Sequence, residues 1–189
     1  MTAFAYYRLP YLHHAHYAVQ HEGEPEVLSS VAELNGKEGF VIAPFSPSSD
    51  CPVLLIHPDE SKLLPISDAK VISTSDSTQA ENASDRDAYA GAFECFHQEL
   101  EKGTFRKIVL ARKATVRTAD KDFENLFMKA CRMYPRLFVS LVYTPQSGMW
   151  LMATPEILLK GELGNMSTMS LAGTQKAEPS RTVADYPVE

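Results

Sequence analysis

Three short segments of the chain hold residue types that can do acid–base chemistry or bind an anion. The first contains Lys107, which strand alternation would place on one face with Phe105, Val109 and Ala111. Burial among apolar neighbours lowers the pKa of a lysine, and such a lysine can act as a general base. The alternative is a lysine at a sheet edge, or one whose ammonium group reaches water.

The second segment contains Glu156, which follows Thr154 and Pro155 and separates two apolar runs, residues 150–153 and 157–159. A carboxyl group at such a sheet corner can have a raised pKa and serve as an acid. The alternative is a turn glutamate that is exposed to solvent, as most glutamates are.

The third segment is the sequence Leu-Ala-Gly-Thr at 171–174, in which Gly173 directly follows a β-rich stretch. A glycine lets the backbone approach a ligand closely, and its N–H group can bind an anion. The alternative is an ordinary turn. Four histidines near the N-terminus have no acidic partner pattern, so we expect no metal site there: His13, His14, His16 and His21.

Two helices are predicted around these segments. Apolar residues at steps of three and four indicate one helix that begins after Ser84 or Asp85 and ends near Gly103, and a second over residues 122–134. The polar stretch 73–85 predicts a mobile loop before the first helix.

Short strands make up most of the remaining pattern. Strands outnumber helices and are joined by short turns, which indicates an α+β fold with a largely antiparallel sheet and flanking helices. Residues 1–36 show no clear pattern. The expected strands are 39–45, 53–57, 104–112, a hairpin of 137–143 and 149–153 around a four-residue turn, 157–160 and 166–171.

Composition excludes several classes of protein. The formal net charge of −6 argues against nucleic-acid binding, and no apolar run approaches the roughly 18 residues that a membrane span needs. The N-terminus lacks the pattern of a secretory signal. Three widely spaced cysteines favour neither a disulfide framework nor a zinc site, so we expect reduced cysteines in a cytoplasmic protein.

The three segments occur in one order: KIVLAR at 107–112, ATPEILL at 153–159 and LAGT at 171–174. Together they resemble the chorismate-binding enzyme family, which comprises isochorismate, salicylate, anthranilate and aminodeoxychorismate synthases. The resemblance covers most of residues 39–175. It implies that the chain folds as the N-terminal part of the chorismate-utilising enzyme fold.

The resemblance implies a role for each motif residue. Lys107 corresponds to the general base of members that add water, Glu156 to the general acid on the opposite face of the ring, and Gly173 to a glycine that lines the substrate site. Members that use ammonia carry glutamine at the position of Lys107, so this lysine indicates an isochorismate synthase. A salicylate synthase, an aminating member and a non-catalytic folding or binding module stay open as alternatives.

The resemblance also implies Mg²⁺, which holds the substrate carboxylate through acidic ligands that follow LAGT in the family. Because the chain ends at Glu189, we expect residues 1–189 to be the N-terminal part of a single chorismate-binding domain and to be inactive alone. We expect chorismate as the small-molecule substrate and self-association through an exposed sheet edge. The sequence does not distinguish a menaquinone pathway from a siderophore pathway.

Overall fold

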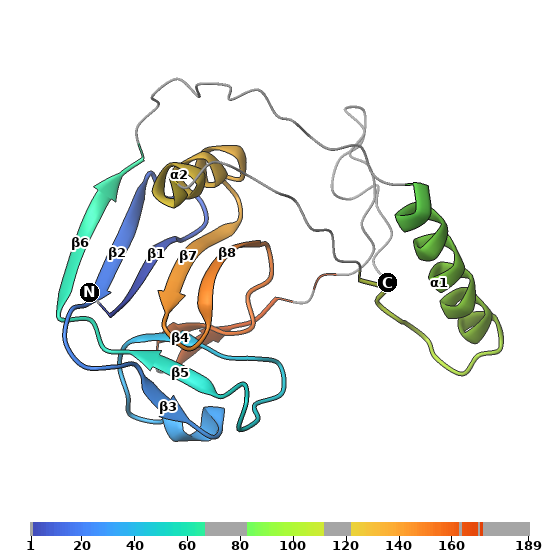
Figure 1. Ribbon diagram of the computed structural model, residues 1–189, viewed down its shortest axis with the longest axis horizontal. Helices are drawn as coiled ribbons and strands as arrows, with labels where there is room; N and C mark the ends of the chain where they lie inside the picture. Colours follow the sequence, from blue (N-terminus) through green and yellow to red (C-terminus); the bar gives the residue numbers. More distant parts are fainter. Residues whose placement is uncertain (1, 67–82, 112–121, 163, 170, 172–189) are drawn as a thin grey trace. The chain divides into compact units, whose positions relative to one another are not determined.

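The computed structural model describes residues 2–66, 83–111, 122–162, 164–169 and 171 (Figure 1). They belong to two compact units, one from residues 1–69 and 122–189 and the other from residues 70–121. Every strand pair among the described residues is antiparallel, and two α-helices accompany the sheets. The predicted α+β class is therefore confirmed.

A five-stranded antiparallel sheet forms the centre of the first unit. Figure 1 shows its strands side by side in the order β6-β2-β1-β7-β8. Their bounds are Glu60–Pro65 (β6), His14–Gln20 (β2), Ala3–Arg8 (β1), Phe138–Thr144 (β7) and Gly148–Thr154 (β8). The predicted hairpin is confirmed as β7 and β8, although its loop is one residue shorter than expected, because Gly148 already pairs with Thr144.

One face of this sheet is covered by α2, Phe123–Met133. Asp122 caps the helix, since its side chain accepts a 3.0 Å hydrogen bond from the backbone N–H of Asn125. Phe127 and Cys131 are buried against the sheet. The predicted helix is confirmed, but part of its expected apolar face is exposed: Phe123, Leu126 and Met133.

The opposite face is covered by a three-stranded sheet in the order β3-β5-β4. Ala3 and Ala5 are fully buried there and contact Ile56 and Val142, because their small side chains leave room for the second sheet. The strands predicted at residues 39–45 and 53–57 are confirmed as β4 and β5. The bounds are Glu26–Leu28 (β3), Phe40–Ile42 (β4) and Val53–Ile56 (β5), with a 3₁₀ helix at Val31–Leu34.

The N-terminal strands are the main element that the sequence pattern missed. β1 and β2 lie in the middle of the main sheet with partners on both sides. The first five residues of β1 are apolar or aromatic on both faces, so no polar period marks it as a strand. The C-terminal prediction also needs correction: residues 157–160 and 166–171 contribute only the short strands β9, Lys160–Glu162, and β10, Asn165–Ser167.

The second unit contains α1, Ala83–Glu101. Gly103 ends it with a positive φ of 72°, and Thr104 N–H donates to the Glu99 carbonyl, as predicted for a C-cap glycine. The helix begins before Ser84, so residues 83–85 of the expected loop are helical, and residues 73–82 lie outside the described residues. Neither described helix is long and apolar enough to cross a membrane.

Candidate functional site

Lys107 lies in the segment 104–111 of the second unit, and its side chain is exposed. The strand predicted over residues 104–112 is wrong for the described part, since residues 104–111 have no regular secondary structure. A strand needs a partner for its backbone hydrogen bonds, and no described strand pairs with this segment. The expected burial of Lys107 among Phe105, Val109 and Ala111 is therefore not found.

Glu156 lies in the first unit, two residues after β8 ends at Thr154. Its backbone N–H donates to the Thr154 side-chain oxygen at 3.2 Å, which forms a local turn at the end of the strand. The Glu156 side chain is exposed, as in the alternative that the sequence left open. Its carboxylate is accessible to a ligand from solvent.

The chain after Glu156 lies beside the segment that leads to the Leu-Ala-Gly-Thr motif. Met169 N–H donates to the Ile157 carbonyl at 2.9 Å, and the Thr168 hydroxyl donates to the Leu158 carbonyl at 2.8 Å. These contacts hold residues 168 and 169 against residues 157 and 158, which directly follow Glu156. Gly173 itself lies outside the described residues.

The predicted pairing of Lys107 with Glu156 across one cleft stays a prediction. Each residue belongs to a different unit, and each is described only within its own. Their catalytic roles therefore rest on the sequence motifs.

The described residues contain no group of three or more His, Cys, Asp or Glu side chains that could hold a metal ion. Two of the N-terminal histidines, His14 and His16, lie with ring centroids 5.5 Å apart on β2, but no acidic side chain joins them.

The match to a known family covers the segments that contain Lys107 and Glu156. A profile of the chorismate binding enzyme family matches residues 54–185, more than two thirds of the chain, and it includes Lys107, Glu156 and Gly173. The chain belongs to the chorismate-binding enzyme family. No curated protein and no solved structure matched it.

Membership in the chorismate-binding enzyme family assigns a chorismate-utilising function, with chorismate as the small-molecule substrate. The order of the three motifs in the sequence therefore identified the family correctly. Family membership alone does not distinguish among the water-adding and ammonia-using reactions of its members.

One feature of the chorismate-binding chain was missed from the sequence. A cavity in the first unit is lined by residues between Tyr7 and Ser61, none of which belongs to the three motifs. Its lining comes from five separate segments, so no local spacing in the sequence could have indicated it.

Proposed function

We propose that the protein is a cytoplasmic isochorismate synthase. The observation that carries the proposal is Lys107 within a chain of the chorismate-binding enzyme family, because ammonia-using members resemble this chain but carry glutamine at that position. Water must lose a proton as it attacks carbon, so its addition needs a base, whereas ammonia is already a nucleophile.

In the proposed reaction the neutral amine of Lys107 takes a proton from water as the water oxygen forms a bond to C2 of chorismate. The ring double bonds shift and the C4–O bond breaks. Glu156, as a carboxylic acid, gives its proton to the departing C4 hydroxyl group, which leaves as water. The Gly173 backbone lines the substrate site.

The side chains of Lys107 and Glu156 are exposed, so each can be reached from solvent. The hydrogen bond from Met169 N–H to the Ile157 carbonyl also holds the Glu156 segment beside the chain that continues to Gly173.

A requirement for Mg²⁺ is part of the proposal. Chorismate is a dicarboxylate, and a carboxylate in a cleft is costly unless a cation or hydrogen bonds offset its charge. The described residues offer no acidic cluster for the ion, so its ligands would come from outside them. Removal of Mg²⁺ with EDTA should abolish turnover, and added MgCl₂ should restore it.

A salicylate synthase is the second candidate, because that group shares the lysine and differs in eliminating pyruvate afterwards. The aminating reaction and a non-catalytic role are less well supported, since Lys107 argues against the first and the family match against the second.

The test is a product analysis of the full-length gene product with chorismate and MgCl₂, with and without ammonium chloride. Isochorismate, detected by chromatography and by coupling to an isochorismatase, is the expected product in both conditions. Salicylate with equimolar pyruvate would replace the proposal by the second candidate. An amino product that appears only with ammonium would refute Lys107 as an indicator of water addition.

A further inference from the structure

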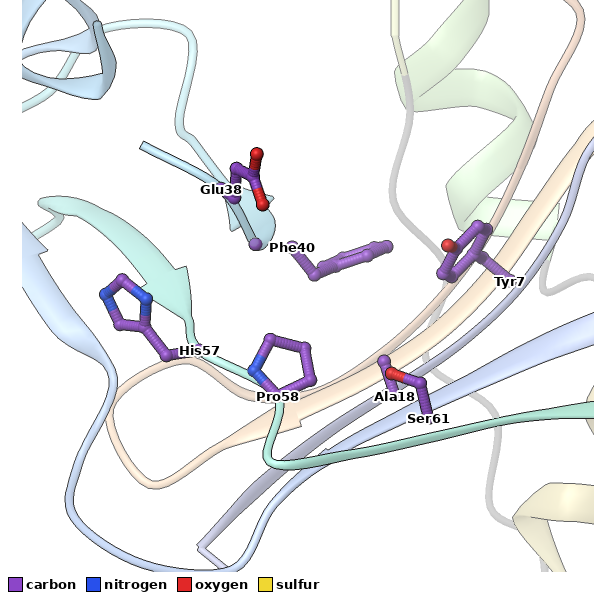
Figure 2. Close-up of a pocket in the computed structure, with 8 residues that line it drawn as sticks. Tyr7, Ala18, Glu38, Phe40, His57, Pro58 and Ser61 are labelled. Atoms are coloured by element: carbon purple, nitrogen blue, oxygen red, sulfur yellow. The ribbon is translucent and has the colours of Figure 1, made fainter. Parts of the chain in front are cut away.

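A cavity of about 470 Å³ lies in the first unit, lined by both of its larger sheets (Figure 2). Tyr7, Ala18 and Ser61 come from the five-stranded sheet, and Phe40 comes from the three-stranded sheet. The volume is within the range of small-molecule sites. Neither Lys107 nor Glu156 is among the residues that line it.

Aromatic rings form one wall of this cavity. The ring centroids of Tyr7 and Phe40 lie 5.5 Å apart, with the ring planes tilted by 39°. His16 stacks on Tyr7 at 4.8 Å with nearly parallel planes, and Phe138 lies 6.4 Å away. These neighbours hold the Tyr7 ring in place. The faces of aromatic rings carry negative partial charge and attract cations.

A second wall is fixed by polar contacts around His57. Its ring Nε2 lies 2.9 Å from a carboxylate oxygen of Glu26, and its backbone N–H donates to the Gln20 side chain at 3.1 Å. Lys37 donates to the other Glu26 oxygen at 2.7 Å. Both His57 and Lys37 therefore bind Glu26.

Glu38, whose side chain is exposed, brings a negative charge to the cavity. Among the described residues its carboxylate makes no hydrogen bond and no ion pair. Figure 2 shows Glu38 next to Phe40 in the lining of the cavity. The adjacent Gly39 has a φ of +150°, and a Cβ atom there would lie 2.3 Å from the Ile56 carbonyl oxygen. Glycine is thus required for the close approach to β5 that places Glu38 at the cavity.

We propose that this cavity binds a small organic ammonium ion. Glu38 would pair with the ammonium group, and the rings of Tyr7 and Phe40 would contact its hydrocarbon part and its charge. An anion is disfavoured, since the Glu38 carboxylate lines the cavity and the chain carries a net charge of −6. The dicarboxylate chorismate is disfavoured as its occupant for the same reason.

The test is an NMR titration of the ¹⁵N-labelled protein with benzylammonium chloride, with benzyl alcohol as a neutral probe of the same shape. We expect saturable shifts of the backbone amides of Gly39, Phe40, His57 and Ser61, with a Kd on the order of 1 mM. Glu38→Gln should weaken binding at least about tenfold and Phe40→Leu about fivefold. Glu24→Gln, which removes the same charge from an exposed side chain that does not line the cavity, should leave the Kd unchanged.

Three outcomes would overturn the proposal. The first is the absence of saturable shifts at the cavity up to about 50 mM benzylammonium. The second is an equal Kd for benzyl alcohol, which would show that charge is not recognised. The third is an equal loss of affinity in Glu38→Gln and Glu24→Gln, because the effect would then reflect overall charge. Overlap of the variant spectra away from the cavity checks that each variant is folded.

Discussion

The Arg8 guanidinium donates a 2.6 Å hydrogen bond to the carbonyl oxygen of Pro135, which lies 127 residues later in the chain. It also donates to the carbonyls of Tyr134 at 2.6 Å and Leu137 at 2.8 Å. Arg8 is only 1% exposed. A buried cation on β1 thus satisfies three carbonyl groups in the connection between α2 and β7, and it fixes where that connection enters the sheet.

Arg8→Ala should lower the free energy of unfolding by roughly 2–4 kcal/mol, because it removes a buried, packed side chain and its hydrogen bonds to the carbonyls of Tyr134, Pro135 and Leu137. Arg8→Lys should lower the free energy of unfolding by less than Arg8→Ala, since an ammonium group keeps the charge but cannot donate in the planar geometry of the guanidinium. Urea unfolding measures both. Arg136→Ala, at an exposed position in the same connection, is the control. A loss for Arg8→Ala no larger than for this control would contradict the assignment.

Gly39→Ala should destabilise the first unit more than Gly36→Ala. Both glycines have positive φ, but a Cβ at Gly39 would lie 2.3 Å from the Ile56 backbone oxygen, whereas nothing lies within 4 Å at Gly36. Backbone strain alone costs about 1–2 kcal/mol, and the clash at Gly39 should add roughly 1–3 kcal/mol. Urea midpoints of the two variants give the comparison. Equal midpoints would show that the backbone moves freely at Gly39.

Glu26 should show a low pKa in the folded protein. Hydrogen bonds from Lys37 and His57 lower the pKa of this carboxyl group, because they favour its charged form. Its contribution to stability is present above the ordinary glutamate pKa and is lost as pH falls through the lowered value. A ¹³C NMR titration of the Glu26 carboxyl should report the shift, and Lys37→Met should raise the pKa. An unchanged pKa in that variant would exclude Lys37 as the main cause.

The β8 edge should make the chain self-associate. This strand has no described partner beyond β7, and its large side chains are 37–56% exposed on both faces: Met149, Trp150, Leu151 and Met152. Light scattering should show a mass that rises with concentration, and Leu151→Lys should reduce it. Leu63→Lys on β6 is the control, because the charged Glu60 and Lys62 already protect that edge. A monomer at all concentrations would refute the prediction.

Lys107→Gln in the full-length gene product should lower isochorismate formation by roughly 10²–10⁴-fold while the fold is retained, because general bases contribute about that much. Added ammonia should partly restore turnover as an amino product. Glu156→Gln should lower isochorismate formation by a similar factor. The double variant should lower it little further, since both residues act in one step. Lys102→Gln, an exposed lysine of the same unit, is the control. Activity within about threefold of the unchanged protein would end the assignment of Lys107.

Local patterns in the sequence were sufficient for several elements. The apolar period over residues 122–134 predicted the helix α2, and Gly103 predicted the end of α1. The two β-rich runs on either side of Pro145 predicted the β7–β8 hairpin. Each of these features depends on residues a few positions apart, so propensity and spacing carry the information. The order of the three motifs likewise identified the family.

Long-range contacts decided the rest. No local pattern shows that β1 lies between β2 and β7, that Arg8 is buried beneath Pro135, or that Glu38 and Tyr7 line one cavity. The same dependence on distant partners explains why the strand predicted around Lys107 is wrong, since its β-rich residues have no described partner strand. The sequence by itself therefore determined the α+β class, the hairpin, the helices and the family. Only the tertiary structure decided strand order, the burial of Arg8 and the cavity, because a strand or a buried charge is stable only with partners far away in the chain.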